Sequence, residues 1–321
     1  MPSWHLSKWR AEVTSFLNSG PNTFFIRITN PMNSLPKSIS LGIILLLSLL
    51  LFQGCSSVGL FYDYAPIVVE WEIDSYFDLP PEQEGWVESR VRAQFAWHRK
   101  QELSTYIDFL REVQRRGGDG LTLMEVKEGH QRIQAYWKRI IDHLLEDTAL
   151  FLSRLEPRQV DYLEQRFEEE NLEWQESRAS TRKERKEERY EDLFDNLEDW
   201  LGDFSPSQEE QLQNLFNQWY QNRLDPILDQ ERRKKERQQI FLSFLRSKPR
   251  LEETRIWLDH WFRNWTDPKD ARSHERREQR ILRNMNRILQ VDALLLQEQR
   301  DHAVEEIEIW IKRLEDGLTN Q

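Results

Sequence analysis

Residues 79–103 read LPPEQEGWVESRVRAQFAWHRKQEL, and this stretch combines a helix start with an amphipathic helix. Proline fits the first turn of a helix because its missing N–H has no partner there, and a Gln near the third helical position can bond to the preceding backbone. One face of the stretch carries residues at helical spacing: Val87, Val91, Phe95 or Gln94, and His98. The stretch therefore predicts a long amphipathic helix over 81–115.

The Pro-x-Gln motif that opens this helix, with an apolar residue before it, occurs three times. The copies are Leu79-Pro80-Pro81-Glu82-Gln83, Leu155-Glu156-Pro157-Arg158-Gln159 and Phe204-Ser205-Pro206-Ser207-Gln208. We interpret each copy as helix-start chemistry. With the other breaks in the chain, the motif predicts helices over 62–77, 81–115, 122–153, 157–201, 206–246, 250–265 and 269–316, and Pro226 should kink or interrupt the fifth. A 35-residue helix is about 50 Å long. The expected fold is all-α, an elongated bundle of long antiparallel helices preceded by a lipoprotein signal peptide.

Composition excludes several classes of protein. With 31% charged and 38% hydrophobic residues among 321, the chain is too polar for a membrane protein with several spans. A single Cys excludes an internal disulfide and a Cys-rich zinc site. The net charge of −11 argues against nucleic acid as a partner, because contacts to phosphate need a basic surface.

The one concentrated apolar run is LGIILLLSLLLF at 41–52, and Gln53-Gly54-Cys55 follows it. Twelve residues are too short to span a bilayer but fit the apolar region of a secretory signal. A small residue directly before Cys at the end of such a run resembles a bacterial lipoprotein signal. The resemblance implies cleavage after Gly54 and acylation of Cys55; an uncleaved anchor is the less favoured alternative. Ser56 and Ser57 stand where an inner-membrane lipoprotein usually has Asp, which favours the inner leaflet of the outer membrane, facing the periplasm.

The N-terminus divides into two expected parts. Residues 1–31 would make the leader of a signal far too long, whereas Met32 is followed by one Lys and then the apolar run. We therefore expect 1–31 to be an over-extended N-terminus, 32–54 the signal peptide and 55–321 the mature helical domain. Residues 1–54 hold 4 of the 45 Lys and Arg and 1 of the 56 Asp and Glu, so the mature chain carries −14. Anionic membranes repel that charge, so the acyl chains must provide the anchor.

The sequence of 61–103 also resembles a known family. Its matching pieces are Asp74-Ser75-Tyr76-Phe77-Asp78-Leu79, Pro81-Glu82-Gln83, Ala96-Trp97-His98-Arg99 and Glu102-Leu103, with Pro157-x-Gln159 and Asn171-x-Glu173 later in the chain. Joined to a lipoprotein signal, these resemble DUF6279, a family of Gram-negative lipoproteins of unknown function. The resemblance extends over nearly the whole mature chain. It implies a lipid-anchored envelope protein and supplies no catalytic residue.

The histidines do not fit the metal sites known in helical bundles. A di-iron site needs Glu three residues before His on two helices, and the helical zinc motif needs His at positions four apart. Phe95, Lys127, Ile140, Trp257, Ala271 and Gln299 are the residues three before the candidate histidines, and none is acidic. We therefore expect no metal, no other cofactor and no catalytic residue of these types.

Two groups of residues remain candidates for function. His98 and Glu102 lie four apart, close enough to pair on one helix face, either as a pH-sensitive or catalytic pair or as a half-buried His satisfied by Glu102. Trp257, Trp261 and Trp265 form a stripe at helical spacing, which is either an aromatic platform for a glycan or peptide or part of the core. In both cases the structural interpretation is favoured. The basic runs at 231–237 and 272–280 are expected to be solvated helix faces.

The favoured function is a lipid-anchored, periplasm-facing outer-membrane protein that acts without catalysis, as an interaction or structural module for envelope proteins. The alternative is a holdase-like periplasmic chaperone for unfolded clients, because the Pro-x-Gln copies look like the Leu-Thr-x-x-Gln repeats of small periplasmic stress chaperones, with the Thr missing from each copy. A third and less favoured class is an envelope enzyme centred on His98 and Glu102.

Overall fold

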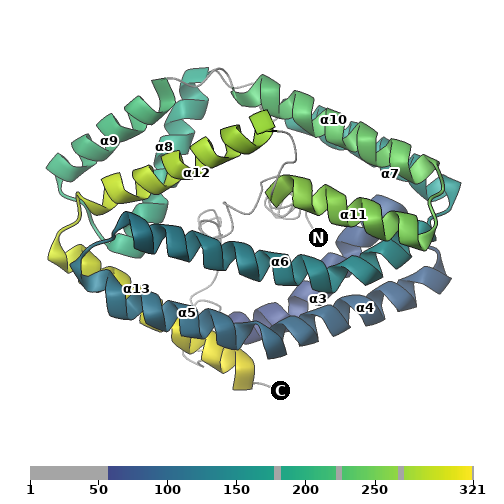
Figure 1. Cartoon of the computed structure of the whole chain (residues 1–321), viewed down its shortest axis with the longest axis horizontal. Coiled ribbons are helices and arrows are strands. Elements are labelled where there is room, and N and C mark those ends of the chain that lie inside the picture. Colours follow the sequence, from purple (N-terminus) through teal and green to yellow (C-terminus); the bar gives the residue numbers. More distant parts are fainter. Residues whose placement is uncertain (1–56, 177–181, 222–225, 267–270, 320–321) are drawn as a thin grey trace, which may run out of the picture.

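The computed structural model describes residues 57–176, 182–221, 226–266 and 271–319. All regular structure in these ranges is helical, without a strand (Figure 1). The α-helices are α3 (Ser57–Phe77), α4 (Pro81–Gln101), α5 (Leu103–Arg116), α6 (Leu123–Ser153), α7 (Pro157–Glu176), α8 (Arg182–Leu201), α9 (Pro206–Gln221), α10 (Pro226–Arg246), α11 (Leu251–Thr266), α12 (Ala271–Asp292) and α13 (Gln297–Thr319). A short 3-10 turn, η2 (Gly117–Asp119), follows α5. The expected signal peptide at 32–54, the stretch 1–31, Gly54 and Cys55 lie outside the described residues.

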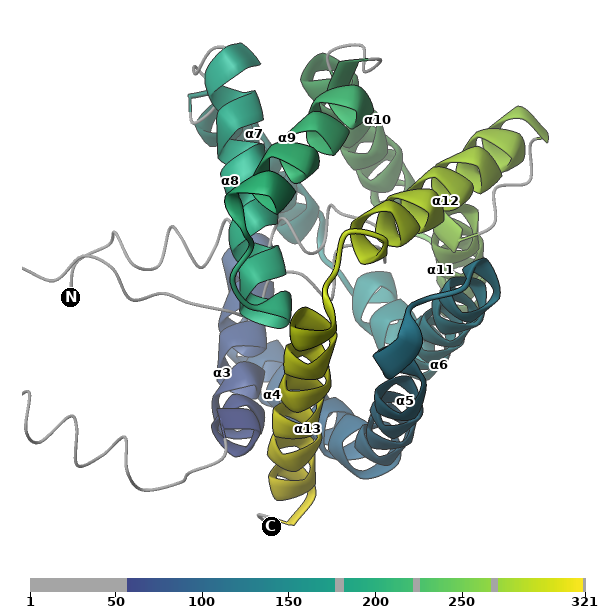
Figure 2. The same ribbon diagram turned by 90° about the vertical axis from the view of Figure 1, so that its left-hand side faces the viewer.

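Many of the helices pack against an antiparallel neighbour, as in a helical bundle. Helix α6 lies against α11, α5 against α13 and α7 against α10. These pairs do not share one bundle axis: they follow a closed circuit around the molecule, with α3 and α13 on one side and α6, α11 and α12 on the other (Figure 2). No helix in the described ranges is long and apolar enough to cross a membrane.

The helix starts predicted from the Pro-x-Gln motif are confirmed, since α4, α7 and α9 begin at Pro81, Pro157 and Pro206. At five helix starts the side chain three residues after the N-cap residue accepts a hydrogen bond from the backbone N–H of that N-cap residue. The acceptors are Glu125 for Thr122, Gln159 for Glu156, Gln208 for Ser205, Glu253 for Arg250 and Gln299 for Leu296, at 2.8 to 3.0 Å. Gln299 thus completes a fourth Gln copy, which sequence reasoning missed because it contains no proline.

The glutamines of these starts meet in two pairs. Gln159 Nε2 donates to Gln83 Oε1 at 2.9 Å, which joins the start of α7 to that of α4. Gln208 Nε2 donates to Gln299 Oε1 at 2.8 Å, which joins α9 to α13. The motif therefore starts helices locally and also connects them over distances of 76 and 91 residues.

Three predicted helices were wrong in extent. The one expected over 157–201 corresponds to two helices, α7 and α8, with 177–181 outside the described residues. The helix expected over 81–115 is broken at Glu102, where the side chain turns inward to an ion pair with Arg139. The helix expected over 269–316 is divided into α12 and α13, because Gln299 caps the backbone of Leu296 and so starts a new helix. The expected interruption near Pro226 is confirmed, since α10 begins there.

The principal core joins four helices. Its buried members are Ala149, Leu152, Val160, Leu163, Leu242, Leu245 and Leu258, from α6, α7, α10 and α11. A second cluster of Val58, Tyr62 and Leu103 fixes α3 against α5 and α13. There the side chain of Val58 packs so closely on Gly317 that a Cβ at this position would lie 2.5 Å from Val58 Cγ1, so a larger residue would force the helices apart. This second cluster borders the predicted site at His98.

Candidate functional site

His98 lies between two tyrosines that belong to different helices. Its Nδ1 is 2.6 Å from the hydroxyl of Tyr62 on α3, and its Nε2 is 3.2 Å from the hydroxyl of Tyr106 on α5. The helical spacing places His98 on the inner face of α4, and the break at Glu102 brings Tyr106 back toward it. Both ring nitrogens are therefore engaged.

Burial controls the charge of this cluster. It lowers the pKa of His98 from its ordinary value of 6.5, although the negative charge of Glu102 opposes the shift. Burial also raises the pKa of Tyr62 and of Tyr106. A neutral imidazole has one donor and one acceptor nitrogen, so one hydroxyl donates to His98 and the other accepts from it. The cluster is thus a neutral chain of hydrogen bonds at pH 7.

Glu102 has a separate partner. Arg139 on α6 donates from Nε to Oε1 at 2.9 Å and from Nη2 to Oε2 at 2.6 Å, which is a bidentate ion pair with a buried carboxylate. The Arg139 guanidinium also lies over the ring of Tyr136, 4.9 Å from its centroid. The structure therefore brings His98 and Glu102 into one cluster, where His98 bonds to tyrosines and Glu102 to an arginine.

The cluster connects several helices. Tyr62, His98, Tyr106 and Arg139 come from α3, α4, α5 and α6, and Arg99 Nε donates to the carbonyl of Gly317 on α13 at 2.5 Å. Sequence reasoning missed these partners because they lie on other helices. In the described ranges no three His, Cys, Asp or Glu side chains gather closely enough to hold a metal ion. Fully bonded groups of this kind position helices, and they leave no nitrogen of His98 ready for a substrate.

The tryptophan stripe lies at the contact between α10 and α11. Trp257 stacks on Phe244 with ring centroids 4.1 Å apart and on Trp261 at 4.7 Å, and it packs against the principal core. The side chain of Trp265 lies outside the described residues. For Trp257 the packing matches the structural interpretation of the stripe.

A hollow between α7 and α10 was not foreseen from the sequence. It has a volume of about 530 Å³, and its floor includes Phe167 and Leu242. A second hollow of about 730 Å³ runs over the outer side of α10. Lys235 and Gln239 line both hollows, and we call the surface that the two hollows make up together the α7–α10 groove.

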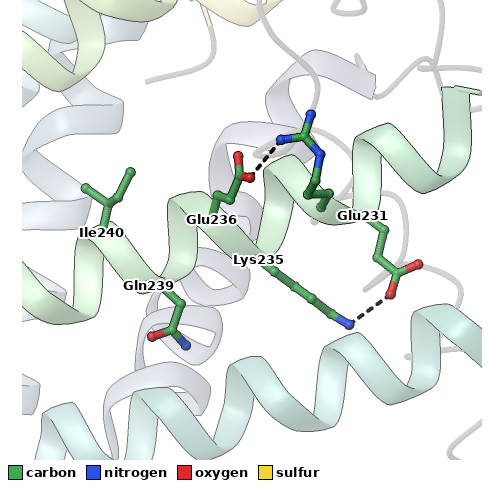
Figure 3. Close-up of a pocket in the computed structure, with 6 residues that line it drawn as sticks. Glu231, Lys235, Glu236, Gln239 and Ile240 are labelled. Atoms are coloured by element: carbon green, nitrogen blue, oxygen red, sulfur yellow. Dashed lines mark hydrogen bonds and ion pairs between the residues drawn. The ribbon is translucent and has the colours of Figure 1, made fainter.

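Charged side chains on α10 are paired along this groove (Figure 3). Lys235 Nζ donates to Glu231 at 2.8 Å, and Arg232 donates to Glu236 at 2.7 Å. The basic run 231–237 thus behaves here as a helix face paired with carboxylates, and Arg277 in the run 272–280 likewise bonds to Glu278 at 3.0 Å. The apolar side chains of the groove are less covered: Leu172 is 60% exposed and Ile240 53%. The helical periodicity of apolar residues along α7 and α10 would have placed both on the polar face of their helix, where an apolar residue is unexpected.

Comparison with known proteins gives a family and no activity. Neither a comparison with curated proteins nor one with solved structures found a match. The model of DUF6279, described as a family of unknown function, matches residues 75–260, a narrower range than the nearly complete mature chain expected from the resemblance. Because this match covers more than half of the chain, the protein belongs to the DUF6279 family.

Proposed function

We propose that the protein is a lipid-anchored lipoprotein on the periplasmic face of the outer membrane that acts by binding other envelope proteins, without catalysis. The sequence supports the anchor through the apolar run 41–52 followed by Gly54-Cys55. The α7–α10 groove supports the binding role.

The exposed apolar side chains of that groove carry the proposal. Leu172 and Ile240 present large apolar surfaces to solvent on two adjacent helices, and several neighbouring polar groups bond to one another. Asn171 Nδ2 donates to Gln238 Oε1 at 2.9 Å, and Lys234 pairs with Glu170 at 3.3 Å with both side chains largely buried. A groove whose polar groups are paired internally and whose apolar residues are uncovered suits a protein segment that inserts Leu, Ile or Phe side chains.

Site-specific photo-crosslinking in intact cells tests this role. A photoreactive residue is placed at Leu172 or Ile240, and a matched control at Leu282, which is 50% exposed on α12. Discrete adducts at the two groove positions and none at the control are expected. Equal crosslinking at all three positions would contradict a binding role for the groove. Mass analysis of the N-terminal peptide tests acylation of Cys55 in the same cells.

A holdase-like chaperone is the second candidate, because an exposed apolar groove also suits unfolded clients. The purified mature protein should then slow aggregation of a reduced, unfolded client. Leu172→Glu combined with Ile240→Glu should abolish that effect, whereas Leu282→Glu should leave it unchanged. A wild-type protein without effect on aggregation rules out this candidate and leaves the binding of folded partners in place.

A further inference from the structure

The outward face of α3 carries a continuous apolar stripe. Phe61, Tyr64, Ile67 and Trp71 are each 45 to 63% exposed, and their spacing of three to four residues places them on one side of the helix. From Phe61 to Trp71 the stripe extends about 15 Å along the helix axis. We call these four residues the α3 stripe.

The opposite face of α3 is fixed to the rest of the molecule. Val58 packs against Gly317 of α13, and Tyr62 bonds to His98 of α4. Figure 2 shows α3 at one edge of the molecule, with α4 and α13 toward the interior. These contacts hold the inner face of α3 against α4 and α13, so the stripe on the opposite face points outward.

Residue types in the stripe match a membrane interface. Trp and Tyr are enriched where a polypeptide meets the headgroup region, and amphipathic helices in this plane bury Phe, Trp and Ile below it. Exposed Asp63 and Asp74 adjoin the stripe, so charge attraction to anionic lipid does not hold it there. Apolar burial alone must provide the contact.

The position of Cys55 next to α3 favours lipid, over another protein, as the partner that covers the α3 stripe. Cys55 precedes the first residue of α3 by two positions, a span of at most about 7 Å. An acyl group on Cys55 would thus hold the start of α3 at the bilayer. We propose that the α3 stripe lies in the headgroup region of the membrane and orients the helical domain on it. The proposal rests on the acylation of Cys55 in the proposed function.

Fluorescence quenching by lipid tests this arrangement with the mature protein. A single cysteine at Ile67 carries the fluorophore, and the matched control carries it at Leu282. Cys55 is the one native cysteine, and an acylated Cys55 does not react with the label. Where mass analysis finds Cys55 unacylated, Cys55→Ser leaves the introduced cysteine as the single labelled position. Each protein is placed in vesicles of phosphatidylethanolamine and phosphatidylglycerol in which some lipids carry bromine on their acyl chains. The label at 67 should be quenched several-fold more than the label at 282, equally with and without phosphatidylglycerol.

The outcomes separate the stripe from the anchor, because acylation is read independently by mass. Acylated Cys55 with equal quenching at both positions overturns the stripe proposal and leaves the anchor. Quenching at 67 without acylation keeps the stripe and overturns the anchor. A label at 67 that is protected from aqueous iodide but not quenched by lipid shows a second copy or another protein on the stripe, and also overturns the proposal.

Discussion

Gln159 and Gln83 hold each other through their side-chain amides, 76 residues apart in sequence. Gln159 is completely buried; its Oε1 accepts from the N–H of Glu156, and its Nε2 donates to Gln83 and, at 3.1 Å, to the carbonyl of Phe77. The pairing is possible because Pro80, at the N-cap of α4, has no N–H. The side-chain oxygen of Gln83 therefore has no N-cap N–H from which to accept a hydrogen bond, and it accepts one from Gln159 of α7 instead.

Gln159→Leu should lower the free energy of unfolding of the mature protein by about 3 kcal/mol, because it leaves buried backbone groups unpaired. Gln83→Leu should cost less, since Gln159 keeps its bonds to Glu156 and Phe77. Denaturant titration measures both changes. Gln165→Leu on the exposed face of α7 is the control, with a change within about 0.5 kcal/mol. Equal effects of all three variants would contradict a role for the pair.

Arg139→Met should destabilise the protein by about 2 to 3 kcal/mol, because it leaves the buried carboxylate of Glu102 without its cation. The loss should be smaller than for a fully buried ion pair, because Arg139 is partly solvated. Adding Glu102→Gln should restore much of the loss. Arg158→Met is the matched control: its pairs with Asp78 and Glu156 are exposed, so its effect should stay within about 1 kcal/mol. A double variant as unstable as the single one would show that packing, not charge, dominates.

The lowered pKa of His98 predicts a loss of stability in acid. Because the folded pKa lies below the unfolded value of 6.5, the unfolded chain binds more protons as the pH falls through 6.5, and stability decreases. His98→Gln keeps hydrogen-bonding groups for both tyrosines but does not titrate. The stability advantage of the wild type over this variant should therefore shrink between pH 7 and pH 5. An NMR titration of His98 should show a midpoint below 6.5, and a midpoint above it would contradict the assignment.

Trp257→Ala should cost about 3 kcal/mol, because the indole fills the space between Phe244 and Trp261 beside the principal core. Ile256→Ala, the adjacent and exposed position on α11, should change stability by less than about 1 kcal/mol. Thermal unfolding of both variants measures the difference. If Trp257→Ala unfolds like the wild type but loses binding to a glycan, the stripe is a platform and not core.

Helix starts are the part of the fold that local sequence determines. At Pro157 and Pro206 the proline, the N-cap residue and the Gln act within one turn, so three or four residues contain the whole signal. The helix start at Gln299 has the same chemistry but no proline, and it was missed. One helix was therefore predicted where the structure has two, α12 and α13. Amphipathic spacing likewise placed His98 on an inner face before any partner was known.

Partners across the molecule depend on the tertiary structure. Nothing within a turn of His98 indicates that Tyr62 and Tyr106 meet its ring, or that Arg139 bonds to both oxygens of Glu102. Sequence alone determined the helical class and most helix starts, because each depends on neighbours along the chain, while the lipoprotein signal stays a prediction. Only the folded chain decided which side chains are paired and which, as in the α3 stripe and the α7–α10 groove, stay exposed, because burial depends on helices far apart in sequence.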